Sequence, residues 1–425
     1  MKKILLTALV LSVFIFGSPF SNVEALAKGK AKPKKSAQVK KKSKNRVKVS
    51  VKRGKSNLAT KRVALRRPSF NRAAVVRVRA LDSLLLKRAE EGIFADDLSG
   101  EDRDMRRAAL SALGGHPGTV VLMNPNTGQV YSIVNQNWAL GKPFKPCSTI
   151  KVLTSIAALS EGLVDPDLQM RLPNGGSLNM IEALARSNNE YFQVLGDQIG
   201  FDIVLKYARE WGLGNTTGIN MAGESTGYLP ESKNIQAVPR MCSHGDDIGV
   251  TAIQLAVMTA ALANGGYIYK PQIIRNEQEK REFKPILLKK VEIAEKNRQK
   301  IIEGMQAAVN WGTARRSGAS PLGVAGKTGS CNGSDSKVGL FASFLSPENP
   351  DLVAVVIATG SSEKGSVSAV IAGEIYNALS YRFEKADRPR RANTAQYQQP
   401  VGSSEEDMDE EDDESEETNG SNEVE

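Results

Sequence analysis

The sequence predicts an α+β fold in which the first and last strands share one sheet. Two apolar stretches carry this prediction, "GTVVLMNPNTGQVYSIVNQ" (residues 118–136) and "KVGLFASFLSPENPDLVAVVIATG" (residues 337–360). Each stretch reads as two strands around a turn that contains proline and asparagine. Mostly helical patterns lie between them, and strands at both ends with helices between are typical of α+β domains.

The predicted helices follow one another along the chain. Two amphipathic patterns precede the first strands, at residues 80–93 and 101–113. Further patterns lie between the strand pairs, at residues 148–163, 180–200, 201–213, 251–266 and 291–312. The last three have a glycine at or next to their end, as many helix C-termini do. A closing helix is predicted at about residues 366–381.

The N-terminus has the layout of a secretory signal peptide. Residues 1–27 hold two lysines, an apolar run at residues 4–16 and the small-residue triplet Ala25-Leu26-Ala27. The apolar run is short for a membrane span, which needs about 20 residues, but an uncleaved anchor stays open. We therefore expect an exported protein, periplasmic or associated with the cell envelope and membrane-anchored if the run is retained.

Charge is distributed unevenly along this 425-residue chain of net charge +10. Residues 28–79 are rich in Lys and Arg and contain no acidic residue, whereas residues 386–425 are strongly acidic. Both segments are predicted to be disordered, which leaves residues 80–385 as the folded domain. The basic arm is expected to act as a tether or to contact an anionic membrane or wall polymer. Export and the lack of interleaved aromatic residues argue against nucleic acid.

Histidine-based and metal-based chemistry find little support. The two histidines, His116 and His244, are each expected to be loop residues, and no metal or cofactor is expected because no ligand spacing is present. The stretch "VAGKTGS" lacks the first glycine of a phosphate-binding loop, because position 321 is proline.

A serine and a lysine lie one helical turn apart in "PCSTIK". Ser148 and Lys151 are at positions i and i+3, so a helix would place both on one face. The amine could take the serine proton if its pKa is lowered by burial or by a second cation. Pro146 favours an abrupt helix start there. By itself the pair is a weak signal, since Ser-x-x-Lys occurs by chance in many helices.

Two further motifs make the signal specific. "ARSNNEYF" contains Ser187-Asn188-Asn189, and "AGKTGS" contains Lys327-Thr328-Gly329. The ordered set Ser-x-x-Lys, Ser-x-Asn and Lys-Thr-Gly resembles the penicillin-binding protein transpeptidase domain, from about residue 102 to residue 382. The resemblance implies a central antiparallel sheet flanked by helices plus an all-helical subdomain, as in the β-lactamases and transpeptidases.

The resemblance also implies a role for each matching residue. Ser148 would be the acylated nucleophile, Lys151 its base, Ser187 a proton relay and Lys327 the support of that relay. Asn189 would hold the substrate backbone, Thr328 its terminal carboxylate, and Gly329 would let the substrate lie close to the strand. The N–H groups of Ser148 and Ser330 would bind the oxyanion.

The function expected from this resemblance is that of a monofunctional DD-transpeptidase or DD-carboxypeptidase. It would form a serine acyl-enzyme on D-Ala-D-Ala stem peptides and take β-lactams as inhibitors. A serine β-lactamase stays open, although no glutamate between Asn189 and Lys327 has the asparagine partner that one class uses. A non-catalytic β-lactam sensor or wall-binding protein is the other alternative.

Cysteine stands where this family usually has the glycine before its nucleophile. In an exported protein the three cysteines, Cys147, Cys242 and Cys331, can pair. The resemblance places the stretches around Cys147 and Cys331 beside one cleft, so a bridge between them stays open. Because side chains alternate along a strand, Cys331 could instead point away, and three separate buried thiols are the favoured expectation.

Overall fold

The computed structural model describes residues 72–383, apart from 233–234 and 334–335. The predicted signal peptide, the acidic tail and the arm up to residue 71 lie outside these residues. Helix α1 begins at Arg72, so the prediction that the disordered arm continues to Arg79 is wrong. Apolar residues between 72 and 79 continue the helical spacing that leads to the buried Leu85. The arginines among them make this segment look like part of the basic arm. No described helix is long and apolar enough to cross a bilayer.

The sheet confirms the predicted α+β architecture. It has five strands in the order β2-β1-β9-β8-β7, every pair of neighbours is antiparallel, and β1 pairs with β9 with Val120 opposite Val356. The first and last predicted strands therefore do share one sheet. In chain order the described helices and strands are α1 (Arg72–Phe94), α2 (Arg103–Leu113), β1 (Gly118–Met123), β2 (Val130–Val134), α3 (Ile150–Ser160), β3 (Met170–Arg171), β4 (Ser177–Leu178), α4 (Met180–Arg186), α5 (Asn189–Ile199), α6 (Phe201–Glu210), α7 (Val238–His244), α8 (Ala252–Asn264), β5 (Tyr267–Tyr269), α9 (Glu277–Glu282), β6 (Leu287–Lys290), α10 (Glu295–Asn310), β7 (Ala325–Asn332), β8 (Lys337–Leu345), β9 (Leu352–Gly360) and α11 (Gly365–Phe383).

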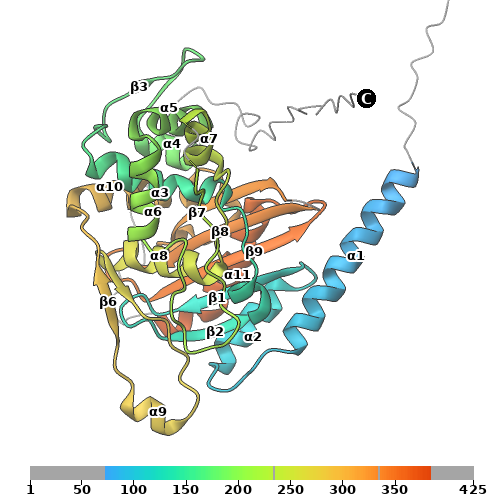
Figure 1. The fold of residues 1–425 in the computed structure, drawn as a ribbon. Coiled ribbons are helices and arrows are strands. Elements are labelled where there is room, and N and C mark those ends of the chain that lie inside the picture. The colour runs from blue at the N-terminus through green and yellow to red at the C-terminus, as the bar shows by residue number, and fades with distance from the viewer. Residues whose placement is uncertain (1–71, 233–234, 334–335, 384–425) are drawn as a thin grey trace, which may run out of the picture. The chain divides into compact units, whose positions relative to one another are not determined.

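Alternation along the strands divides the core into two layers. Val121 and Val355 belong to the core that includes α3, α5 and α8, whereas Val120 and Val356 belong to the core formed with α2 and α11. Figure 1 shows α3 to α7 gathered in one helical group. Both faces of the sheet are covered, which explains why its central strands are apolar at nearly every position.

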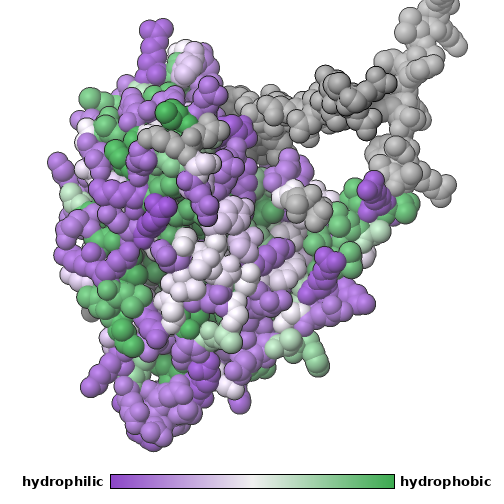
Figure 2. Space-filling view, viewed as in Figure 1, coloured by the Kyte–Doolittle hydropathy of each residue, from purple (hydrophilic) through white to green (hydrophobic). Residues whose placement is uncertain are grey.

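Helix α1 is attached to the domain mainly through its C-terminal half. Leu85 and Ala89 are buried, and Asp82 accepts hydrogen bonds from the backbone and side chain of Ser361, after β9. Its exposed side is mixed (Figure 2): Val76 is 62% exposed and Leu84 44% exposed, beside charged side chains such as Lys87.

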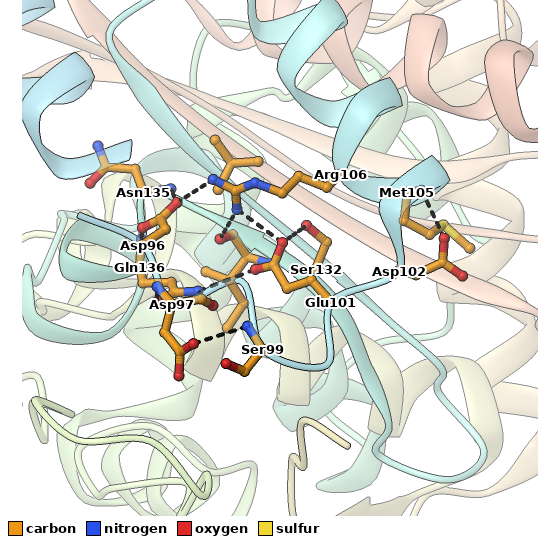
Figure 3. Close-up of polar contacts among 12 residues, drawn as sticks. Asp96, Asp97, Ser99, Glu101, Asp102, Met105, Arg106, Ser132, Asn135 and Gln136 are labelled. Atoms are coloured by element: carbon orange, nitrogen blue, oxygen red, sulfur yellow. Dashed lines mark hydrogen bonds and ion pairs between the residues drawn. The ribbon is translucent and has the colours of Figure 1, made fainter. Parts of the chain in front are cut away.

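A buried ion-pair network joins the segment after α1 to strand β2 (Figure 3). The Arg106 guanidinium contacts the carboxylates of Asp96 at 2.8 Å and Glu101 at 2.9 Å, whose side chains are only 1% and 2% exposed. Asp96 also accepts the N–H groups of Asn135 and Gln136. Burial raises the pKa of the Asp96 carboxyl, against the opposing effect of Arg106. This one cation therefore compensates two buried carboxylates.

Replacing Arg106 by methionine is expected to lower the free energy of unfolding by about 3–5 kcal/mol, because it leaves two buried carboxylates without a cation. Removing the cation takes away the effect that opposes burial at Asp96, so protonation of the Asp96 carboxyl in the folded state becomes more favourable. The variant should therefore regain stability as the pH falls from 8 to 5. Urea denaturation of wild type and variant at several pH values measures both effects.

The neighbouring arginine provides a matched control. The Arg107 side chain is 76% exposed and contacts Asp104 at 3.2 Å, so Arg107→Met should change stability by no more than about 0.5 kcal/mol. Equal losses in the two variants would show that the buried network does not stabilise the domain.

Candidate active site

Ser148 lies in a tight turn at the start of helix α3. Residues Cys147–Thr149 form one turn of 3-10 helix, and Pro146 precedes it with a φ of −69°. The side chains of residues i and i+3 line up in this geometry, so Lys151 Nζ lies 3.0 Å from Ser148 Oγ. Ser148 is 8% exposed. The predicted pairing of hydroxyl and amine on one face, after an abrupt helix start at Pro146, is confirmed.

The Lys151 amine lies in a wholly buried position surrounded by oxygen atoms. It donates to Asn189 Oδ1 at 2.7 Å, to Ser187 Oγ at 3.1 Å and to the Ser187 carbonyl. These contacts are neutral side-chain and backbone oxygens. They fix the amine beside the Ser148 hydroxyl.

Ser187 and Asn189 reach this amine because they lie where helix α4 ends and helix α5 begins. Ser187 has a left-handed conformation with a φ of 57° at the end of α4, and the Asn188 side chain caps α5 by accepting the Tyr191 N–H at 2.8 Å. The prediction of one continuous helical pattern over residues 180–200 is therefore wrong. The break turns Ser187 and Asn189 toward Lys151.

Strand β7 brings the second lysine to the same hydroxyl. Lys327 is wholly buried, and its Nζ donates to Ser187 Oγ at 2.7 Å and to the Thr328 carbonyl at 2.9 Å. Ser187 Oγ therefore lies between the two lysines, 3.1 Å from one amine and 2.7 Å from the other.

Thr328 pairs with a residue that sequence reasoning did not single out. Its Oγ1 is 2.7 Å from Thr313 Oγ1, and the Thr313 N–H donates to the Ala185 carbonyl. Thr313 lies after α10 in "WGTARR", where no local pattern distinguishes it from a turn residue. It orients the Thr328 hydroxyl from the segment that follows α10, 15 residues earlier in the chain.

The last part of β7 is packed tightly between two other segments. A Cβ atom on Gly329 would lie 3.1 Å from the Pro146 carbonyl oxygen and 3.2 Å from Thr149 Cγ2. On the other side a Cβ atom on Gly365, at the start of α11, would lie 2.8 Å from the Gly329 backbone. Ser330 Oγ accepts the Gly365 N–H at 2.8 Å. Glycine at both positions lets β7 approach the nucleophile turn closely.

The sequence profile of the penicillin binding protein transpeptidase domain matches residues 118–377. The chain belongs to this family. The matched residues include every one of the predicted site residues.

Individual relatives are distant. The chain is 26% identical over 308 residues to stage V sporulation protein D of Bacillus subtilis, which covers 60% of this chain and 48% of that protein. It is 23% identical over 347 residues to the peptidoglycan D,D-transpeptidase MrdA of Acinetobacter baumannii, with coverages of 63% and 51%. This chain thus spans about half the length of these curated relatives.

Solved structures agree on the fold. The penicillin-binding protein PBP2 of Pseudomonas aeruginosa, crystallised with WCK 5153, matches with a TM-score of 0.59 and 25% identity over 66% of this chain and 75% of that one. The D,D-transpeptidase domain of a peptidoglycan glycosyltransferase from Eggerthella lenta matches with a TM-score of 0.54 and 22% identity over 66% and 82%. The predicted transpeptidase-like architecture is therefore confirmed.

The transpeptidase domain contains a disulfide beside its nucleophile. Cys147 and Cys331 are bonded, with their Cα atoms 5.7 Å apart. The favoured expectation of three separate thiols is wrong, and the Cys147–Cys331 bridge that was its alternative is confirmed. Cys242 is a buried free thiol, and burial raises its pKa to about 12.

Both histidines of the transpeptidase domain form their hydrogen bonds with residues other than Ser148. His116, in the predicted loop before β1, contacts Glu363 at 2.8 Å. His244 is the last residue of α7, so the loop prediction is wrong there. Ser243 Oγ donates to the Pro239 carbonyl, so it accepts the His244 Nδ1–H at 2.7 Å. Burial, with Arg240 and Lys151 nearby, lowers the His244 pKa to about 4, and the ring is neutral at pH 7.

A cavity of about 300 Å³ opens beside the nucleophile segment, lined by Lys145, Tyr228, Ala237, Arg240, Asp246, Asp247 and Ile248. The Asp246 carboxylate forms ion pairs with Lys145 at 2.5 Å and with Arg240 at 2.7 Å. Lys145 precedes Ser148 by three residues, so this polar cavity adjoins the nucleophile turn. Among the described residues no group of three metal-ligating side chains comes together.

Proposed function

We propose that this chain is a monofunctional penicillin-binding protein that acts as a peptidoglycan DD-transpeptidase or DD-carboxypeptidase. The observation that supports this most is the position of two buried lysines around two serines. Lys151 lies 3.0 Å from Ser148 Oγ, and Lys327 lies 2.7 Å from Ser187 Oγ. This arrangement provides a nucleophile, a base and a separate proton relay in one site.

Acylation begins when the neutral Lys151 amine takes the Ser148 proton. Ser148 Oγ attacks the carbonyl of the penultimate D-Ala, and the carbonyl oxygen accepts hydrogen bonds from the N–H groups of Ser148 and Ser330. Breakdown of the tetrahedral intermediate breaks the peptide bond. Ser187 passes its proton to the leaving D-Ala amine and regains one from Lys151, 3.1 Å away, which returns Lys151 to its neutral form. The charge of Lys327, 2.7 Å from Ser187 Oγ, supports this transfer.

Substrate binding uses the residues around this relay. The Thr328 hydroxyl, oriented by Thr313 at 2.7 Å, hydrogen-bonds the terminal carboxylate near the positive Lys327. Asn189 holds the peptide backbone with its amide, and Gly329 allows the substrate to lie along β7. An amine acceptor or water then attacks the ester and releases Ser148.

A fluorescent penicillin labelling experiment with an unlabelled chase tests the proposal. A stable covalent label supports a penicillin-binding enzyme, a label that is lost within minutes indicates a β-lactamase, and no label indicates a non-catalytic protein. Product analysis with purified peptidoglycan fragments then separates cross-linking from removal of the terminal D-Ala.

We propose that the basic arm, residues 28–71, holds the exported protein on an anionic membrane or wall polymer. Its composition supports this, because it contains no acidic residue. The mature protein should sediment with anionic lipid vesicles at low salt and be released at high salt. Deleting residues 28–71, which leaves helix α1 in place, should abolish sedimentation and leave penicillin labelling unchanged. Sedimentation of the truncated protein equal to that of the full chain would disprove this role.

A further inference from the structure

The disulfide joins the two segments that carry the proposed oxyanion donors. Cys147 directly precedes Ser148 in the nucleophile turn, and Cys331 directly follows Ser330 on β7. The cysteines are 184 residues apart in sequence. A single covalent link therefore spans the gap between the Ser148 N–H and the Ser330 N–H.

Cys147 has an unfavourable backbone conformation. Its φ is +48°, in the left-handed region that is strained for a residue with a side chain. Glycine adopts this conformation without that strain. A non-glycine residue stays in such a conformation only where the surrounding structure holds it. The peptide unit between Cys147 and Ser148 carries the Ser148 N–H, so relaxation of this φ would turn that donor.

Strand β7 needs a restraint at the same place. It is the edge strand of the described sheet and pairs with β8 alone. Burial decreases along its end, where Ser330 and Cys331 are half-buried and Asn332 is exposed. Gly329 contacts the nucleophile turn through van der Waals packing against Pro146 and Thr149. Beyond Gly329 the Cys147–Cys331 bridge links the strand covalently to the turn.

We propose that the Cys147–Cys331 disulfide is a positioning element for acylation, which holds Cys147 in its left-handed conformation and keeps the Ser148 and Ser330 N–H groups directed at one point. The inference rests on the proposed function, because it needs the acyl transfer at Ser148. The cysteines touch neither substrate nor reacting atoms. Their effect is on the geometry of the two donors.

The experiment measures the rate of penicillin labelling as a function of penicillin concentration for the oxidised full-length protein. Loss of one oxyanion donor typically costs about 10²–10³ in rate, so misdirecting a donor should cost less, about 10–100-fold. Cys331→Ser should lower the limiting acylation rate by this factor. The dissociation constant of the non-covalent complex should stay essentially unchanged, because the carboxylate contacts at Thr328 are intact.

A second variant separates positioning from general stabilisation. In the double variant Cys147→Gly/Cys331→Ser the bridge is absent, but glycine adopts the left-handed conformation without strain. Its acylation rate should recover most of the loss. A variant that is slow only because the domain is less stable would not be rescued in this way, and thermal unfolding of all three proteins checks that they are folded.

Reduction provides an independent measurement. Dithiothreitol transfers two electrons to the bridge, which yields two thiols and the cyclic disulfide of the reagent. Wild type should lose acylation rate by the same factor and regain it on reoxidation, whereas Cys331→Ser should not respond. The Cys242→Ser variant should behave as wild type, because Cys242 is not in the bridge.

The outcomes distinguish the inference from the proposed function. If oxidised wild type takes no label at Ser148, the proposed function itself fails. If wild type labels and Cys331→Ser labels equally fast, only the positioning role of the bridge is overturned. A double variant as slow as Cys331→Ser would likewise overturn it, because strain at Cys147 would then not be the cause.

Discussion

Replacing Ser148 by alanine is expected to abolish covalent labelling by penicillin. The Ser148 hydroxyl lies 3.0 Å from the buried Lys151 amine, at the start of α3. A β-lactam offers a strained amide in place of the peptide and a carboxylate for Thr328. Mass spectrometry of wild type should find one penicilloyl group, on the peptide that contains "PCSTIK".

Ser187 is the one rival nucleophile that the geometry suggests. Its Oγ lies 3.1 Å from Lys151 Nζ and 2.7 Å from Lys327 Nζ. An adduct on Ser187 in the Ser148→Ala protein would exchange the proposed roles of the two serines. Wild type that takes no adduct at high β-lactam concentration would contradict the acyl-enzyme mechanism altogether.

A neighbouring serine on the same helix provides the control. Ser155 is buried, and its hydroxyl donates to the Lys151 carbonyl at 2.8 Å, within the helix backbone. Ser155→Ala removes a hydroxyl of the same kind from the same element without touching the amine. It should therefore label at the rate of wild type.

The apolar patterns predict strands β1, β2, β8 and β9, whereas only the family resemblance places the Lys327-Thr328-Gly329 segment on a strand. Strands β1, β8 and β9 have long apolar runs because helices cover both faces of the sheet. Strand β7 reads "AGKTGSCN", and its lysine and glycines do not resemble a buried strand. Lys327 is buried there because Ser187 and the Thr328 carbonyl accept its hydrogen bonds. No single-sequence pattern reveals such partners 140 residues away.

Side-chain alternation along β7 predicts the position of Cys331 correctly only when the face of the strand is fixed from Lys327. Alternation along β7 was the reason to expect Cys331 to point away from Cys147. The same alternation puts Lys327, Gly329 and Cys331 on one face, since they are two residues apart. That face lies against the nucleophile turn, because Lys327 reaches Ser187 and Gly329 packs on Pro146. Cys331 therefore faces Cys147, because it lies on the same face of β7 as Lys327.

The residue types of the site and one of its contacts could be predicted from the sequence, whereas the rest of its geometry could not. The spacing of Ser148 and Lys151 already predicts their contact, because i and i+3 share a helix face. The left-handed Ser187 could not be inferred in this way, since "MIEALAR" and "NEYFQVLGDQI" both fit a helix. Asn188 is the local signal for the break, because asparagine is a preferred N-cap.

Lys151→Ala is expected to slow penicillin labelling by about 10²–10⁴, the usual contribution of a general base. Without the amine the Ser148 hydroxyl keeps its ordinary, weak nucleophilicity. Lys327 does not substitute for it, because its amine is directed at Ser187 Oγ at 2.7 Å and at the Thr328 carbonyl. Residual labelling should still map to Ser148. The measurement is the second-order rate constant of labelling.

Two comparisons separate loss of the base from damage to the site. Removal of Lys151 also takes the partner from Asn189 Oδ1, at 2.7 Å, so part of the loss could come from a displaced amide. Lys151→Met fills the same volume without an amine and should be as slow as Lys151→Ala. Added methylamine should accelerate the alanine variant, whose cavity admits a small base, and should leave the methionine variant unchanged. Labelling of Lys151→Ala at the wild-type rate would show that another group takes the Ser148 proton.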